Sequence, residues 1–255
     1  MAVHVRDDGA VRIVTIDRPE VRNAVDRPTA DALEHAFTEF EATPELAVGV
    51  LTGAGGTFCA GADLHALGDP ERRNRLERST HAPMGPTRLQ LDKPLIAAVE
   101  GHAVAGGLEL ALWCDLRILA KDAVLGVFCR RWGVPLIDGG TVRLPRLIGL
   151  GPALDLILTG RAVPADEAKQ LGLATRVVAP GTALEGALSL AHQLAALPQT
   201  TLRADRRSAL RSFDGELSEA LLAEHDGGVT AIEAGGMWPG VQRFRAGAGR
   251  HGDPA

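Results

Sequence analysis

The sequence predicts an α/β protein that ends in a helical region, and three stretches support this fold class. Residues 11–52 show a strand pattern, a helix pattern and a second strand pattern in that order. Residues 95–120 form an almost entirely apolar stretch that again indicates strand, helix and strand. Beyond Pro198 the pattern is helical, with no strand. We therefore expect an α/β core over residues 1–197 and a helical region over residues 198–255.

The composition is that of an ordinary globular protein. The 255 residues are 45% hydrophobic with a net charge of −5 and no basic stripe, so we do not expect nucleic acid as a partner. Cys59, Cys114 and Cys129 form no C-x-x-C pair, which disfavours a zinc site or a disulfide framework and favours a reducing cytoplasm. The polar N-terminus does not resemble a signal peptide, and no apolar run approaches the ~18 residues of a membrane span.

The first elements follow from local patterns. Residues 11–17 alternate as a strand does, and Pro19 ends that strand. Asp26 is suited to cap a helix from about residue 28 to 41, which has apolar residues at helical spacing. Residues 46–52 predict a second strand, and the intervening helix implies a right-handed crossover and a parallel pair.

Two irregular segments follow. The Gly/Ala-rich residues 53–64 do not match a nucleotide-phosphate motif, because Phe58 occupies the last glycine position. Their small side chains would let backbone N–H groups approach a ligand, and a flexible surface turn is the alternative. Residues 67–92 carry Arg72, Arg73, Arg75 and Arg78, for which a solvated face is favoured over a loop that meets an anionic ligand.

The central stretch is the best candidate for chemistry. Residues 95–99 predict a buried strand and residues 108–113 a buried helix, with Gly106 and Gly107 at the helix N-terminus, where backbone amides lack partners. Glu109 lies in the first turn of that helix. An ionised carboxylate in dry surroundings is costly unless it has a partner or a chemical role. A capping or paired carboxylate is the alternative, and nearby His102 is interpreted as a hydrogen-bonded structural residue.

The rest of the chain indicates strands at residues 115–120 and 175–179, and helices opening near residue 139 and spanning 153–159, 165–171 and 182–197. No G-x-S-x-G elbow occurs, which disfavours an α/β-hydrolase. No H-E-x-x-H or similar histidine pair is present, so we expect no metal centre.

Several short motifs in a fixed order resemble one known family. They are Arg18-Pro19-Glu20 with Asn23-Ala24, Phe58-Cys59-Ala60-Gly61-Ala62-Asp63-Leu64, Lys93-Pro94-Leu95-Ile96-Ala97-Ala98-Val99-Glu100-Gly101, Ala105-Gly106-Gly107-Leu108-Glu109-Leu110, Cys114-Asp115, and Gly139-Gly140-Thr141 with Arg143-Leu144-Pro145. Each motif alone is weak, but their order and spacing together are specific. Over essentially its full length the chain resembles the crotonase superfamily, the enoyl-CoA hydratase/isomerase enzymes.

The resemblance implies a fold, an assembly and a substrate. The fold is a crotonase-like spiral of ββα turns followed by a C-terminal α-helical trimerisation region, assembled as a homotrimer or a dimer of trimers. The substrate is an acyl-CoA thioester, with coenzyme A as part of the substrate and no permanently bound cofactor. By resemblance, the N–H groups of Ala62 and Gly106 hold the thioester oxygen, and the CoA and substrate contacts are Arg22, Ala24, Ala60, Asp63, Leu64 and Gly107.

One departure from the family pattern bears on the reaction. Hydratases of this family typically use two glutamates, one matching Glu109 and a second that falls, by register, at Cys129. A thiol with an ordinary pKa of ~8.5 is a poor substitute for a carboxylic acid near neutral pH. Ile137 also stands where some isomerases carry an acid. Asp138 is an alternative acid/base, although capping of the following helix is the stronger interpretation.

Three functions therefore remain open. The first is a hydratase-type lyase that adds water to an α,β-unsaturated CoA thioester through an enolate, with Glu109 as acid/base. The second is an enoyl-CoA isomerase, or another reaction of this family that needs a single carboxylate. The third is a non-catalytic acyl-CoA binding protein, against which Glu109 argues because binding alone needs no carboxylate there.

Overall fold

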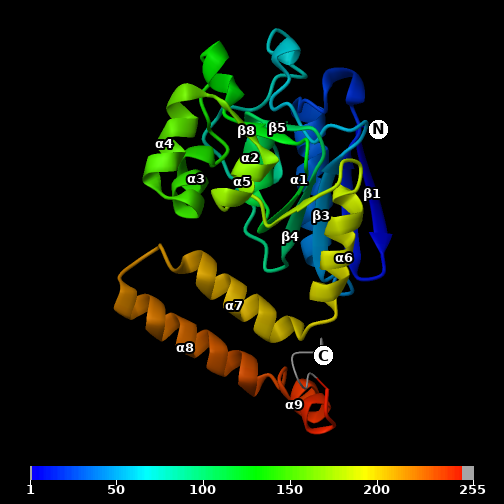
Figure 1. The fold of residues 1–255 in the computed structure, drawn as a ribbon, viewed down its shortest axis with the longest axis vertical. Helices are drawn as coiled ribbons and strands as arrows, with labels where there is room; N and C mark the ends of the chain where they lie inside the picture. The colour runs from blue at the N-terminus through cyan, green and yellow to red at the C-terminus, as the bar shows by residue number, and fades with distance from the viewer. Residues whose placement is uncertain (1, 249–255) are drawn as a thin grey trace.

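The computed structural model describes residues 2–248 and contains two sheets (Figure 1). The larger sheet has the order β1-β2-β3-β4-β6-β9, and all neighbouring strands are parallel except the β1–β2 hairpin. Its strands are β1 (Val3–Asp8), β2 (Val11–Ile16), β3 (Val48–Gly53), β4 (Leu95–Val99), β6 (Leu116–Ala120) and β9 (Arg176–Val178). The parallel β2–β3 pair confirms the parallel pairing expected from the sequence.

The smaller sheet comprises three short strands in the order β5-β7-β8: β5 (His102–Val104), β7 (Val124–Gly126) and β8 (Ala162–Pro164). The chain enters it at Gly101, where φ is +54° and a Cβ would lie 2.4 Å from the Gly56 carbonyl oxygen. One strand of each sheet followed by a helix makes one turn of the spiral. β4, β5 and α2 (Gly106–Trp113) form such a turn, which places the first residue of α2 directly after the small sheet.

The remaining helices cover the sheets or extend from them (Figure 1). Asp26 caps α1, accepting a hydrogen bond from the Thr29 amide at 3.2 Å. Glu100, after β4, accepts hydrogen bonds from the amides of Gly181 and Ala183 at the start of α6. The helices that complete the core are α1 (Arg27–Ala42), α3 (Gly140–Ile148), α4 (Leu150–Thr159), α5 (Ala165–Gln170) and α6 (Ala183–Ala195).

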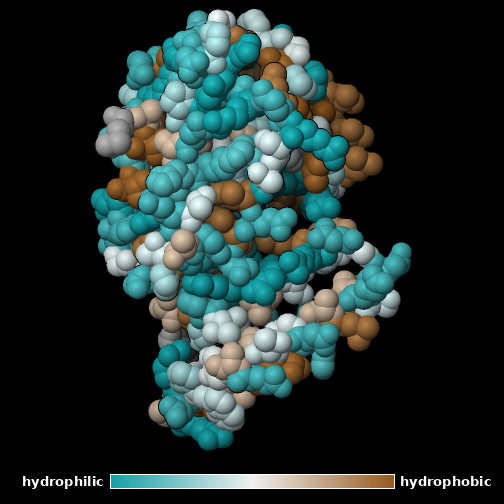
Figure 2. All heavy atoms as spheres, turned by 180° about the vertical axis from the view of Figure 1, so that it is seen from behind, coloured by the Kyte–Doolittle hydropathy of each residue, from teal (hydrophilic) through white to brown (hydrophobic). Residues whose placement is uncertain are grey.

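The C-terminal helices α7 (Gln199–Arg211), α8 (Leu217–Glu233) and α9 (Trp238–Arg245) follow Pro198 and project from the body of the molecule (Figure 1). Arg206 of α7 links them to the core: its Nε lies 2.9 Å from Asp115 Oδ2, beyond the C-terminus of α2. Apolar atoms are visible on the surface of the projecting part (Figure 2). The large exposed apolar residues of α8 are Leu217, Leu221, Leu222, Val229 and Ile232.

Candidate active site

Glu109 is buried in the first turn of α2, with 2% of its surface exposed. Its Oε1 accepts two backbone hydrogen bonds, from Asp138 N at 2.9 Å and from Gly140 N at 2.8 Å. Its Oε2 accepts no hydrogen bond from any residue between 2 and 248. The carboxyl group is therefore held in one orientation with one oxygen left for a water molecule or a substrate.

The environment of Glu109 suits proton transfer near neutral pH. Burial raises the pKa of Glu109 to about 7; the Gly140 amide opposes this effect, and the charge of nearby Asp138 adds to it. Carboxyl groups with strongly raised pKa values are candidates for general acid/base catalysis, because both protonation states are then accessible.

Two free backbone amides lie close to each other beside the start of α2. In residues 2–248, neither Ala62 N nor Gly106 N donates a hydrogen bond. The loop with Ala62 and the first residue of α2 are in contact, since a Cβ at Gly61 would lie 3.0 Å from Gly106 N. Gly61 has a φ of +102° and is held by a hydrogen bond from Val25 N to its carbonyl at 2.8 Å. Such a pair can stabilise a negatively charged oxygen.

The residue that precedes α2 has a strained backbone. Ala105 has φ 53° and ψ −126°, a combination that glycine adopts far more readily than alanine. It is held by a hydrogen bond from its own N–H to the Gly126 carbonyl at 2.9 Å, and its carbonyl accepts from Glu109 N at 3.2 Å. This conformation sets the direction of the Gly106 amide that follows.

Hydrogen bonds hold several of the residues expected to contact CoA near the Ala62 loop. Ala60 N donates to the Arg22 carbonyl at 3.0 Å, and Arg18 Nη1 donates to the Ala24 carbonyl at 2.6 Å. Arg22 and Leu64 are exposed, as a contact with a large ligand requires. Their roles in binding stay predictions.

Asp63, another expected CoA contact, is buried and ion-paired. Its Oδ2 lies 2.9 Å from Arg18 Nη2 and 3.2 Å from Arg72 Nη2, and both arginines also pair with Asp26. Its Oδ1 accepts from His65 N. The side chain therefore has a structural role, and any contact that Asp63 makes with CoA would involve its backbone.

Close packing explains the glycine at position 107, and Cys129 is a buried thiol. A Cβ at Gly107 would lie 2.1 Å from the Cys59 carbonyl oxygen, so only glycine lets α2 approach this segment. Cys129 lies in the short helix Phe128–Trp132, and burial, reinforced by the charge of Glu109, raises the pKa of its thiol. The thiol is therefore neutral at physiological pH, and ligand or catalytic roles for both residues stay predictions.

The capping interpretation of Asp138 is wrong. Helix α3 has Gly139 as its N-cap with no side-chain cap hydrogen bond. Instead, Asp138 Oδ1 accepts from Met84 N at 3.0 Å and from Thr87 Oγ1 at 2.7 Å. Asp138 turns away from the helix because donors from a segment more than fifty residues earlier in the chain are within reach.

One further expectation needs correction, and another is refined. His102, interpreted as a hydrogen-bonded structural residue, is exposed at the start of β5, and its ring makes no hydrogen bond to residues 2–248. Arg72 and Arg75 pair with the acids Asp26 and Asp31 but keep 43% and 39% of their side-chain surface exposed, so the solvated-face interpretation holds for them as it does for Arg73 and Arg78.

The site also includes residues for which no role was predicted from the sequence. Arg143 donates from Nη1 to the Asp138 carbonyl at 2.8 Å and from Nη2 to the Thr87 carbonyl at 2.6 Å. Met84 packs on α2, because a Cβ at Gly106 would lie 2.7 Å from its Sδ. Residues 67–92 have no periodic pattern, so no sequence signal identified Met84 or Thr87.

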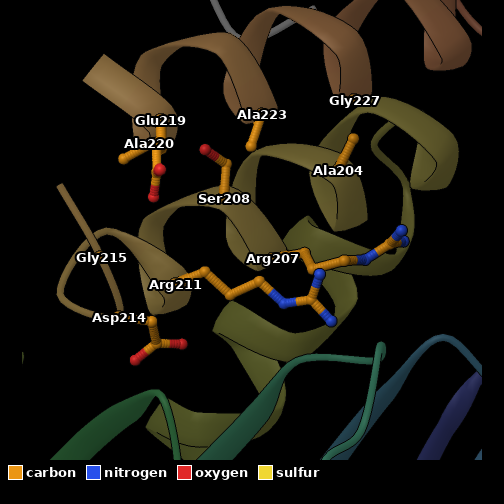
Figure 3. Close-up of a pocket in the computed structure, with 10 residues that line it drawn as sticks. All are labelled: Ala204, Arg207, Ser208, Arg211, Asp214, Gly215, Glu219, Ala220, Ala223 and Gly227. Carbon is orange, nitrogen blue, oxygen red and sulfur yellow. The ribbon is translucent and has the colours of Figure 1, made fainter. Parts of the chain in front are cut away.

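Two cavities do not include Glu109 among their lining residues. One of about 340 Å³ separates α7 from α8, with Arg211 and Asp214 at its rim and the small residues of α8 opposite (Figure 3). Another of about 450 Å³ lies between α7 and the core and includes Trp113 and Arg206. Among residues 2–248, no group of three or more His, Cys, Asp or Glu could hold a metal ion. No helix in this range is long and apolar enough to cross a bilayer.

Comparison with known proteins agrees with the geometry. The family model described as enoyl-CoA hydratase/isomerase matches residues 6–244. Enoyl-CoA hydratase EchA19 of Mycobacterium tuberculosis is 38% identical, covering 78% of this chain and 77% of its own. The short-chain-enoyl-CoA hydratase of Clostridium acetobutylicum is 34% identical, covering 88% and 87%.

Solved structures give the same result for the fold. The crystal structure of enoyl-CoA hydratase EchA1 from Mycobacterium marinum superposes with a TM-score of 0.91 at 34% identity, covering 96% of each chain. This similarity extends through most of the C-terminal helices as well as the core. The chain therefore belongs to the enoyl-CoA hydratase/isomerase family, within the crotonase superfamily.

Proposed function

We propose that this protein is a hydratase-type lyase that adds water to an α,β-unsaturated CoA thioester, or removes it in the reverse direction. The observation that carries the proposal is Glu109, a buried carboxyl group with one anchored oxygen, one free oxygen and a pKa of about 7. It lies on the helix whose first amide is unpaired. Similarity to relatives named as enoyl-CoA hydratases supports the same reaction.

In the proposed mechanism, the amides of Ala62 and Gly106 donate to the thioester oxygen. Glu109 Oε2 takes a proton from water as the water oxygen bonds to Cβ of the substrate, and the electrons of the C=C bond move to the carbonyl to form an enolate. Protonated Glu109 then delivers this proton to Cα, which restores the thioester carbonyl and returns Glu109 to its ionised form. Each amide would contribute ~3 kcal/mol of transition-state stabilisation. Coenzyme A enters as part of the substrate, bound beside Arg22, Ala60 and Leu64.

The test is hydration of a short 2-enoyl-CoA by the purified full-length protein. The reaction is monitored as loss of the absorbance of the conjugated thioester. Glu109→Gln is expected to abolish most of the turnover, whereas Glu39→Gln, a change at an exposed glutamate of α1, serves as the matched control. If the wild-type protein leaves 2-enoyl-CoA unchanged, the hydratase proposal is wrong.

An isomerase is the second candidate, and Cys129 is the observation that favours it. The neutral thiol replaces the usual second glutamate, and a shift of a double bond needs only one group to remove a proton and return it. Turnover of 3-enoyl-CoA that exceeds hydration of 2-enoyl-CoA would favour the isomerase.

Assembly and location belong to the same proposal. We propose that residues 198–255 are an oligomerisation region that forms a homotrimer or a dimer of trimers; residues 249–255 of this region lie outside the described residues. The exposed apolar residues of α8 support burial against another subunit. Sedimentation velocity would test this assembly. The free cysteines among the described residues suit a reducing compartment, and we propose a cytoplasmic location.

A further inference from the structure

Asp138 is a second buried carboxyl group at the site, with 4% of its surface exposed. Its Oδ1 is anchored by Met84 N and Thr87 Oγ1, and its Oδ2 accepts no hydrogen bond from residues 2–248. Asp138 therefore has the same arrangement as Glu109, in which one oxygen is held by two donors and the other is free. None of the donors to Asp138 is a cation, so burial of this group has no ion pair to explain it.

The backbone of Asp138 connects the same loop to the proposed acid/base. Its N–H donates to Glu109 Oε1, and its carbonyl accepts from Arg143 Nη1. Arg143 Nη2 closes the network by donating to the Thr87 carbonyl. Glu109, Asp138, Thr87 and Arg143 thus form one hydrogen-bonded unit.

Asp138 anchors the segment that contains Met84, and the Met84 side chain packs against Gly106, the proposed donor residue. We call this packed side chain the Met84 wall. Met84 is 1% exposed, and its side chain fills the space that a Cβ at Gly106 would need. Displacement of Met84 would alter the packing at the first residue of α2. Asp138 therefore contacts the Met84 segment through its side chain and Glu109 through its backbone N–H, and Gly140 N is the second anchor of Glu109.

We propose that Asp138 is a positioning residue: it joins Glu109 and the Met84 wall in one unit and places a second negative charge beside Glu109. This inference rests on the acid/base role proposed for Glu109. It assigns no contact between Asp138 and substrate.

The charges around Glu109 predict the direction in which its pKa should change when Asp138 loses its charge. Burial is the main reason that the pKa of Glu109 is raised, and the Asp138 charge raises it further. Arg143 acts in the opposite direction, and Cys129 also faces Glu109 but is neutral. Burial raises the pKa of Asp138 itself, against hydrogen bonds from Thr87 and Met84 and the charges of Arg88 and Arg143. Removing the Asp138 charge should therefore lower the pKa of Glu109.

The decisive experiment compares the titration of Glu109 in the wild-type protein and in Asp138→Asn. Asparagine keeps an oxygen that can accept from Met84 and Thr87 but carries no charge. The full-length protein is labelled with ¹³C at the glutamate side-chain carboxyl carbon, and the Glu109 signal is assigned by its loss in Glu109→Gln. The Glu109 midpoint is expected to fall by roughly one pH unit or more in Asp138→Asn. The acidic limb of kcat/KM for 2-enoyl-CoA should move in the same direction.

Two variants separate charge from structure. Asp122→Asn removes an exposed acid, so it should leave the midpoint and the activity unchanged. Thr87→Val removes one donor to Asp138 and keeps its carboxyl group, but the loss of this hydrogen bond raises the pKa of Asp138. It should therefore lower kcat/KM and lower the Glu109 midpoint by less than Asp138→Asn does. If Asp138→Asn does not fold, Asp138→Ser keeps a small acceptor without charge and replaces it in the comparison.

The outcomes are distinguishable from those of the hydratase test. An unchanged Glu109 midpoint in a folded Asp138→Asn protein overturns the inference, even when the wild type hydrates 2-enoyl-CoA. A wild-type protein without turnover contradicts the proposed function, but the NMR titration still decides whether Asp138 acts on Glu109.

Discussion

Two groups of buried carboxylates lie close to the proposed substrate site, and their surroundings are opposite. Asp26 and Asp63 are bound by Arg18 and Arg72 within 3.3 Å. Glu109 and Asp138 accept hydrogen bonds from backbone amides and one hydroxyl, and no arginine contacts either carboxyl group within 4.0 Å among residues 2–248. Both groups have little exposed surface, so burial alone does not distinguish them.

The difference appears in the pKa values. For Asp26, burial alone would raise the pKa, but the hydrogen bonds from Thr29 and Arg72 outweigh it and the pKa is lowered. For Glu109 burial dominates, and the pKa rises to about 7. A cation fixes a carboxylate in its charged form, whereas neutral donors orient it and leave both protonation states accessible. The presence or absence of a paired arginine side chain therefore separates buried acids with a structural role from buried acids that can exchange a proton.

The largest expected effect lies in the cation-free group. Glu109→Gln removes the only carboxyl group proposed to exchange a proton with water or substrate, so kcat for 2-enoyl-CoA should fall by about 10³-fold. The amide oxygen of the substituted glutamine can still accept from Asp138 and Gly140, so the fold should persist. Steady-state kinetics with a circular dichroism control would measure this, and turnover within a factor of a few of wild type would contradict the assignment.

Much of the fold could be predicted from local patterns. The alternation of residues 11–17, the Asp26 cap and the apolar run 95–99 correspond to β2, α1 and β4. Strand β1 was not predicted, because four of its six residues are exposed and it is defined by pairing with β2. The strands of the small sheet have three residues each, too few for a periodic pattern to develop.

The site was only partly predictable, for a similar reason. Glu109 and Gly106 could be identified because a helix N-terminus is a local feature with known unpaired amides. Ala62 entered only through the family resemblance. The role of Asp138 depends on Met84 and Thr87, which lie 54 and 51 residues earlier in the chain, and no local pattern indicates such contacts.

In the arginine-bound group, the largest effect should be on stability. Asp63→Asn leaves Arg18 and Arg72 without one of their buried partners, which should lower the free energy of unfolding by about 3 kcal/mol. The pH dependence of kcat should stay that of wild type. Urea denaturation would measure the loss, with the exposed Asp122→Asn as control. A stable Asp63→Asn protein with a shifted pH profile would reverse the proposed division between the two groups.

Asp63→Asn should lower the free energy of unfolding, whereas Glu109→Gln should raise it at high pH. The folded-state pKa of Glu109 is raised from 4.5 to about 7, so its contribution to stability is fully present below pH 4.5 and is lost as pH rises to about 7. Glutamine has no such loss. At pH 8 the variant should be more stable than wild type by up to about 3 kcal/mol, and the difference should shrink towards pH 4.5. Urea denaturation at a series of pH values checks this, and a difference that does not change with pH would contradict the raised pKa.

The smallest effect concerns the backbone that aims the Gly106 amide. Because φ 53° and ψ −126° strain an alanine, Ala105→Gly should raise the free energy of unfolding by about 1 kcal/mol after the entropy cost of glycine is subtracted. It should also lower kcat, since a freer residue before α2 orients the amide less strictly. Denaturation and kinetics on the same preparation would test both. A variant that is less stable than wild type would show that alanine adopts this conformation without strain. Backbone strain at Ala105 would then have no part in orienting the Gly106 amide.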